Sequence, residues 1–165
     1  YTFPPVWWRE RLGGLALTSA GPGIVQLRPA PERVAPDDPP VEPVAYGIAR
    51  RAAWLTCDAH AIYLPVLWEA APRPTADLSI FVHLTGAARA PVLVTADRSA
   101  PVYGFYPFTA WSAREQVRDD FTLPRLPGGT VVRTGLYKQD VGGSFINYGE
   151  LALPVADCQP VAGTS

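Results

Sequence analysis

The sequence has no methionine and a single lysine, Lys138, and its 14 basic residues nearly balance its 15 acidic ones. The basic residues form no stripe or patch, so the charge pattern that binds phosphate backbones is missing. We therefore expect no nucleic-acid partner. No run of about 20 apolar residues is present to span a membrane. Because the first residue is Tyr1 and not methionine, we expect this chain to be part of a longer protein.

Groups that carry chemistry are also few. The sequence contains two histidines, His60 and His83, and no G-x-S-x-G motif, glycine-rich phosphate loop or calcium loop of the D-x-D-x-D-G type. The simplest interpretation of His83 is a hydrogen-bonded histidine within a sheet. An enzyme would need converging carboxylates or a histidine beside a nucleophile. We therefore expect a non-catalytic module with no metal and no cofactor.

Two cysteines are present, Cys57 and Cys158. A bond between them would close a loop of about 100 residues, stabilise the fold and indicate an oxidising compartment. The alternative is two separate buried thiols. Their spacing does not match a zinc site.

Proline and glycine, by contrast, are frequent, with 19 and 14 residues. They separate short apolar runs, a distribution typical of strands joined by turns. The predicted strands cover residues 12–19, 24–28, 61–70, 78–85, 91–96, 114–123, 130–138 and 147–155. Together with the length, this pattern predicts an all-β protein, an antiparallel two-sheet β-sandwich of immunoglobulin-like or jelly-roll-like type with about eight or nine strands.

Three predicted strands alternate in hydropathy, which indicates one buried face on each. Their apolar faces carry Ile62, Leu64, Val66 and Trp68, then Leu78, Ile80, Val82 and Leu84, and finally Val117, Phe121 and Leu123. Asp119 shares this last face, and we expect it to be partly buried against Arg114 or Arg118. Pro65 lacks a backbone donor, so its strand is expected to be an edge strand or to contain a bulge.

Residues 1–43 differ from the rest of the chain. They begin with an aromatic, proline-rich stretch that includes Trp7 and Trp8, and they end in a linker with six prolines between Pro29 and Pro43. We expect an N-terminal extended segment over residues 1–43 and the β-sandwich domain over residues 44–165. The two together are expected to make one domain.

The feature that best fits a ligand site is a loop at residues 103–111 with five aromatic residues. Aromatic faces accept the C–H faces of sugars, and neighbouring polar groups accept or donate to the hydroxyls. The candidate ligand-binding residues are Tyr103, Tyr106, Trp111, Arg114 and Asp97. The alternative is that these rings bury themselves and anchor the loop over one end of the sandwich.

Several short blocks appear in order between residues 46 and 155: Ile62-Tyr-Leu-Pro-Val-Leu-Trp68, Ser79-Ile-Phe-Val-His-Leu84, Tyr106-Pro107 with Trp111, Glu115-x-Val117-Arg-Asp119-x-Phe121-x-Leu123-Pro124, and Gly135-Leu-Tyr137. This stretch resembles the soluble domain at the end of polytopic membrane glycosyltransferases of Chloroflexi-type bacteria, which are related to protein mannosyltransferases and lipid-A aminoarabinose transferases. The usual Pro-Gly before the glutamate is replaced here by Ser112-Ala-Arg114, which leaves the turn type there open. Residues 1–43 have no counterpart in the family.

The resemblance implies an extracytoplasmic β-sandwich attached to a membrane-embedded half that holds the catalytic acid. No catalytic residue carries over to this chain. Two functions follow as hypotheses. The first is an accessory domain that contacts carbohydrate through an exposed aromatic platform. The second is a structural or protein-interaction module that packs on its own membrane half or on a partner, through an apolar patch that includes Trp7 and Trp8.

Overall fold

The computed structural model describes residues 15–21, 24–29, 41–86 and 91–160, and the chain divides into two compact units, residues 1–40 and 41–165. In the first unit, β1 (Leu15–Gly21) pairs antiparallel with β2 (Ile24–Pro29), close to the two strands predicted there. Trp7, Trp8 and most of the predicted linker lie outside the described residues. The division falls after Pro40, three residues before the predicted boundary.

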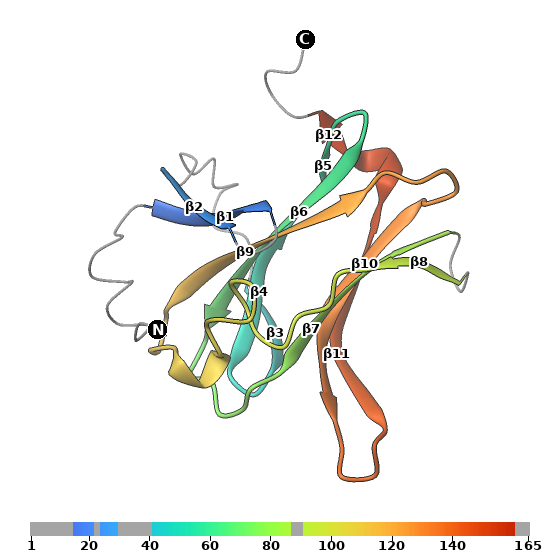
Figure 1. Cartoon of the computed structure of the whole chain (residues 1–165). Helices are drawn as coiled ribbons and strands as arrows, with labels where there is room; N and C mark the ends of the chain where they lie inside the picture. The colour runs from blue at the N-terminus through green and yellow to red at the C-terminus, as the bar shows by residue number, and fades with distance from the viewer. Residues whose placement is uncertain (1–14, 22–23, 30–40, 87–90, 161–165) are drawn as a thin grey trace. The chain divides into compact units, whose positions relative to one another are not determined.

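The second unit is a two-sheet all-β sandwich, as predicted (Figure 1). The four-stranded sheet has the order β11 (Phe145–Pro154), β10 (Val131–Gln139), β7 (Ser79–Thr85) and β8 (Val92–Thr95). The six-stranded sheet contains β12 (Gln159–Pro160), β5 (Thr56–Cys57), β6 (Ala61–Ala70), β4 (Ile48–Ala53) and β3 (Glu42–Ala45), with β9 (Gln116–Pro124) paired to β6. Two short 3-10 turns cover Phe108–Ala110 and Val155–Asp157.

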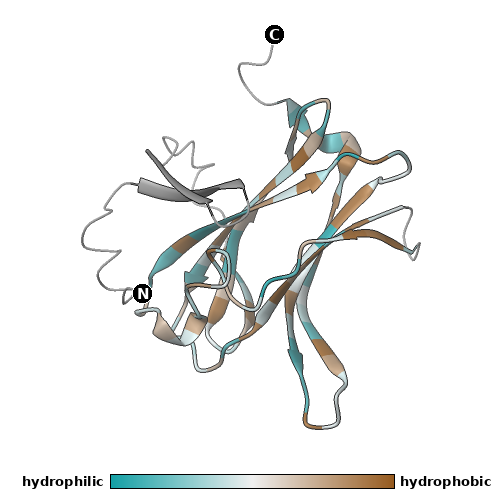
Figure 2. Ribbon diagram, viewed as in Figure 1, coloured by the Kyte–Doolittle hydropathy of each residue, from teal (hydrophilic) through white to brown (hydrophobic). Residues whose placement is uncertain are grey.

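The core lies between the two sheets and is built from the alternating faces that the sequence predicts. The apolar residues predicted on the inner faces of β6, β9 and β7, including Leu78 just before β7, are all buried. The inner face of β10 adds Val132 and Leu136 to the same cluster. Figure 2 shows apolar and polar residues alternating along these strands. The outward positions of β7 and β10 are therefore free to form a surface on the opposite side of the four-stranded sheet.

Pro65 corrects one prediction. Its strand, β6, is not an edge strand: it pairs with β9 along its length on one side and with both β4 and β5 on the other. The register shift in the β4–β6 pairing lies on β4, between Arg50 and Ala52, and not at Pro65. The carbonyl of Pro65 accepts a hydrogen bond from the amide of Trp54, which lies between the end of β4 and the start of β5. The missing donor of Pro65 thus falls where one partner strand gives way to the next.

A disulfide joins Cys57 on β5 to Cys158, with 5.9 Å between the two Cα atoms. Cys158 directly precedes β12, which pairs parallel with β5. The bond therefore ties the end of the described chain to the edge of the six-stranded sheet.

Candidate functional site

The aromatic loop does not form the exposed platform that the sequence suggested. Trp111 and Phe108 are fully buried, and their ring centroids lie 4.8 Å apart. Phe108 also contacts Trp68 of β6 edge to face, at 6.2 Å. Large aromatic side chains gain most by burial, and here they close one end of the core. Trp111 is therefore not part of an exposed aromatic platform in this structure.

Tyr106 and Tyr103 are half-buried and interact with the protein itself. The Tyr106 hydroxyl donates to Oε1 of Glu115 at 2.5 Å, and its ring lies 5.8 Å from that of Trp111. Tyr103 stacks on the guanidinium of Arg98, with 4.0 Å from the carbon Cζ to the ring centroid. Phe105 is the loop's exposed ring, with 67% of its surface accessible. The structure thus brings Tyr106 and Trp111 together as an anchor for the loop.

Arg114 occupies the turn between Trp111 and β9. Its side chain is exposed, its backbone has a φ of 64°, and its amide donates to the carbonyl of Ala70 at 2.7 Å. A positive φ is the conformation that glycine adopts most easily. The turn type that the sequence left open is therefore a left-handed turn of the kind that a glycine would favour.

Asp119 is buried, but its partner is neither Arg114 nor Arg118. Its Oδ1 accepts from Nη1 of Arg98 at 2.5 Å and from the amide of Val102 at 3.2 Å. Arg118 instead pairs with Asp120. Burial raises the pKa of Asp119 to about 7, although Arg98 and the Val102 amide oppose this shift. The prediction named the wrong arginine because Arg98 lies 21 residues away in the sequence.

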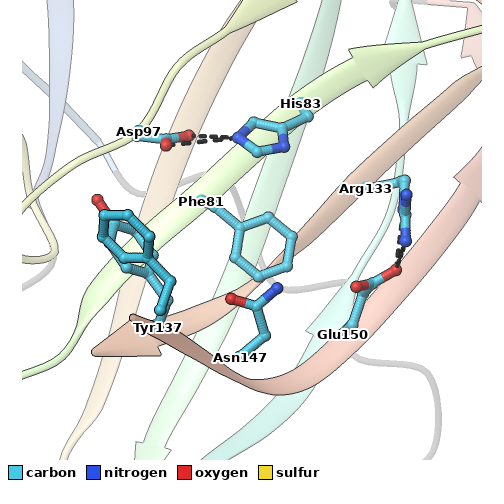
Figure 3. Close-up of a pocket in the computed structure, with 8 residues that line it drawn as sticks. Phe81, His83, Asp97, Arg133, Tyr137, Asn147 and Glu150 are labelled. Atoms are coloured by element: carbon cyan, nitrogen blue, oxygen red, sulfur yellow. Dashed lines mark hydrogen bonds and ion pairs between the residues drawn. The ribbon is translucent and has the colours of Figure 1, made fainter. Parts of the chain in front are cut away.

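A pocket of about 380 Å³ lies on the outer face of the four-stranded sheet (Figure 3). Its lining residues come from β7, β10 and β11 and from the segment after β8: Phe81, His83, Asp97, Arg133, Tyr137, Phe145, Asn147 and Glu150. Asp97 is the one sequence-predicted site residue in this pocket. The lining side chains on β7 and β10 alternate with the buried residues of the same strands, so they point away from the core.

Aromatic rings form the apolar part of the pocket. Phe81 is buried, with 5% of its surface accessible, and lies over Gly135 of β10, its partner in the ladder. A Cβ atom at Gly135 would come within 2.7 Å of the Phe81 ring, so this glycine makes the space that the ring occupies. Tyr137 and Phe145 meet edge to face with 5.6 Å between centroids, and Phe145 is 64% exposed.

Two ion pairs flank the Phe81 ring (Figure 3). His83 Nε2 lies 3.1 Å from Oδ1 of Asp97, and the same carboxylate oxygen accepts from the amide of Val82 at 3.1 Å. Arg133 donates from Nε to Oε1 of Glu150 at 2.8 Å, and its Nη2 also contacts that oxygen. The prediction that His83 is a hydrogen-bonded histidine in a sheet agrees with this contact.

Asn147 lies beside Phe81 in the same pocket (Figure 3). Across the part of the chain that the structure describes, neither its amide nor the Tyr137 hydroxyl hydrogen-bonds to another side chain. The pocket therefore combines apolar faces, oriented charged pairs and two polar groups that are available to a ligand.

Sequence reasoning missed this pocket because its residues meet only through strand pairing. Phe81 and His83 share the outer face of one strand, while Arg133 and Tyr137 share that of another. Asn147 pairs with Tyr137 across β10 and β11. The available signal was the mixture of aromatic and charged residues at alternate positions of two predicted strands. Their adjacency required the strand order, which the sequence left open.

Within residues 41–86 and 91–160, no group of three or more histidine, cysteine, aspartate or glutamate residues is placed to hold a metal ion. The described residues also include no helix of the length and apolarity that crossing a membrane requires. No known family model, curated protein or solved structure matches the chain. The class defined by its own geometry is a two-sheet β-sandwich with a ligand-sized pocket on one outer sheet face.

Proposed function

We propose that residues 41–165 form a non-catalytic accessory domain that binds carbohydrate in the pocket on the outer face of the four-stranded sheet. The observation that carries this proposal is the composition of the pocket, where the rings of Phe81, Tyr137 and Phe145 are surrounded by paired and unpaired polar groups. A volume of about 380 Å³ falls within the range of small-molecule sites.

Sugars have two kinds of surface, and the pocket offers a complement to each. Their C–H faces are apolar and stack on aromatic rings, a role that the exposed Phe145 and the adjoining Tyr137 can take. Their hydroxyls both donate and accept hydrogen bonds. Asn147 supplies a donor and an acceptor, as amides do, and the Arg133–Glu150 pair supplies both on neighbouring strands.

The same lining supports a binding role without catalysis. It contains no serine, threonine or cysteine that could act as a nucleophile beside His83. Each of its two carboxylates is engaged, Asp97 by His83 and Glu150 by Arg133. A glycosidase pair requires one carboxyl group held as an acid and another free to attack or to activate water, an arrangement that these two charge-paired groups do not favour.

The domain is placed outside the cytoplasmic membrane as part of this proposal. The Cys57–Cys158 disulfide is typical of oxidising compartments, and the resemblance to the end domains of membrane glycosyltransferases points to the same location. In that setting, a membrane-embedded half of the same protein would be a partner, and the pocket would hold the acceptor glycan or a cell-surface polymer.

The test uses two phenylalanines of nearly equal exposure, Phe145 in the pocket and Phe105 in the loop. The whole chain is titrated by calorimetry with neutral oligosaccharides of glucose, mannose, xylose and galactose. Phe145→Ala should weaken binding by about tenfold, the value of one aromatic contact of about 1.4 kcal/mol. Phe105→Ala should bind as the wild type does.

Loss in Phe105→Ala alone would move the site to the loop, and equal loss in both variants would contradict a site confined to the pocket. Absence of binding to every oligosaccharide by a protein with an intact melting transition would contradict the proposal. It would favour the alternative, a structural or protein-interaction module that packs on its own membrane half or on a partner.

A further inference from the structure

We infer that the pocket on the outer face of the four-stranded sheet selects neutral saccharides over anionic ones such as uronates. This inference rests on the proposed function, because it specifies the class of glycan that the same pocket accepts. The supporting observation is that each charged side chain lining the pocket is already paired with another side chain of the lining (Figure 3).

Arg133 is the permanent cation of the lining, and it is neutralised locally. Its Nε and Nη2 both donate to Oε1 of Glu150, across the β10–β11 pair. The two side chains are 37% and 36% exposed, so the pair is solvated and its strength is modest. Its importance here lies in charge balance, since an entering carboxylate would meet Glu150 together with Arg133.

His83 provides no spare positive charge at the other side of the Phe81 ring. Its Nε2 faces Asp97, whose Oδ1 is also fixed by the Val82 amide. When the imidazole is neutral, this side of the pocket is negative. When the imidazole is protonated, its charge is matched by Asp97. In neither state is a cation left for a ligand.

Two further cations directly follow lining residues in the sequence: Lys138 has its Nζ 5.6 Å from the ring centroid of Tyr46, and Arg98 is also engaged. Its Nη1 donates to Asp119 and its Nη2 to the carbonyl of Asp120, while its guanidinium lies between the rings of Tyr103 and Phe121. The polar groups that remain for a ligand are the Asn147 amide, the Tyr137 hydroxyl and the unused positions of the Arg133–Glu150 pair. These suit hydroxyls, which both donate and accept.

The experiment compares ligands that differ only in charge. Hexamers of β-1,4-mannose and β-1,4-mannuronate share linkage and ring stereochemistry, and β-1,4-glucose and β-1,4-glucuronate hexamers form a second such pair. For the wild-type chain, we expect the neutral member of a bound pair to bind at least about tenfold more tightly, because like charges across a binding site disfavour the complex.

Glu150→Gln removes the carboxylate that neutralises Arg133. We expect the ratio of uronate affinity to neutral affinity to rise about tenfold, and this gain to shrink in high salt, because the new attraction is between exposed charges. The matched control is Asp157→Asn, which makes the same change in net charge at an exposed position outside the pocket. Its ratio should equal that of the wild type.

The outcomes separate the two proposals. If the wild type prefers the uronate member of a pair, or if Glu150→Gln leaves the ratio unchanged, the selectivity is overturned while carbohydrate binding stands. If neither member of any pair binds, the proposed function fails and the selectivity fails with it.

Discussion

Asp119 lies at the inner face of β9 with unequal partners for its two carboxylate oxygens. Oδ1 accepts from Arg98 and from the Val102 amide, whereas the buried Oδ2 has no partner among the described residues. Val102 and Tyr103 both have positive φ, of 52° and 59°. Such backbone is strained for side-chain-bearing residues and persists only where its surroundings hold it. Asp119 and Arg98 together fix this strained turn.

The stability of the domain should therefore depend on the protonation of Asp119. Burial raises its pKa from an ordinary 3.8 to about 7, so between these values the folded state holds a proton that the unfolded state releases. By linkage, the free energy of unfolding falls as the pH rises through that range, by at most about 1.4 kcal/mol per pH unit for one group. The fall should level off above the folded pKa.

Asp119→Asn should remove this pH dependence of the free energy of unfolding, even if it also lowers that free energy by the same amount at every pH. The measurement is urea unfolding at several pH values from about 4 to about 8. Asp157→Asn is the control, because that carboxylate is exposed and is not among the groups that shift the pKa of Asp119; it should retain the pH dependence. Parallel curves for wild type and Asp119→Asn would show that Asp119 does not take up a proton on folding.

On the scale of strands, β7 and β10 are held close by a glycine. Gly135 pairs with Phe81, and a Cβ at this position would lie 2.7 Å from the ring and 3.0 Å from the carbonyl oxygen of Tyr148. Gly135→Ala should lower the free energy of unfolding by about 1–3 kcal/mol, the usual cost of overpacking. It should also weaken oligosaccharide binding, because the displaced Phe81 ring lines the pocket.

Gly135→Ala in a Phe81→Ala background tests whether the clash with the Phe81 ring causes the loss of stability. With the ring removed, the clash is relieved, so Gly135→Ala should cost clearly less there than in the wild type, as a double-mutant cycle measures. Gly142→Ala, in the β10–β11 turn, has only the flexible Asp140 side chain nearby and should cost little. Equal costs of Gly135→Ala in both backgrounds would assign the strain to the Tyr148 carbonyl instead.

The strands show why some elements could be predicted and others could not. Alternation alone placed β6, β7 and β9 and their buried faces, since each has apolar residues at every second position. β5 and β12 are two residues long, too short for any period, and β4 carries Arg50 and Arg51 among alanines. Arg50 is buried because it contacts Glu42 and the carbonyl of Gly149, partners that only the fold brings near.

The sequence did not predict where the candidate pocket lies, nor, apart from Asp97, which residues line it. The sequence indicated a surface of aromatic and polar residues, and the structure contains one, but the densest aromatic segment, which includes Trp111, closes the core. A segment rich in aromatic residues is as consistent with a buried anchor as with an exposed binding surface. The pocket gathers its rings from separate strands: Phe81 on β7 pairs with Gly135 on β10, two residues before Tyr137, and this proximity depends on the β7–β10 pairing. Of the predicted site residues, Asp97 alone lies in the pocket.

For the molecule as a whole, the Cys57–Cys158 disulfide is a covalent cross-link between residues 101 positions apart in the sequence. It acts on the unfolded chain by closing a loop that contains the whole four-stranded sheet together with β6 and β9 of the six-stranded sheet. It stands on the edge of the six-stranded sheet, whereas the pocket lies on the four-stranded one. Stability and binding should therefore respond differently to its loss.

Replacing both cysteines by serine should lower the free energy of unfolding by about 2–5 kcal/mol, because a loop of about 100 residues is no longer closed in the unfolded state. At temperatures where the variant is still folded, its oligosaccharide affinity should stay close to that of the wild type. Urea unfolding with and without dithiothreitol checks this, since the reductant should destabilise the wild type and leave the double variant unchanged. Equal stability of the reduced and oxidised wild type would remove the argument for an oxidising compartment. A disulfide that does not stabilise the fold gives no reason to place the domain in a compartment where disulfides form.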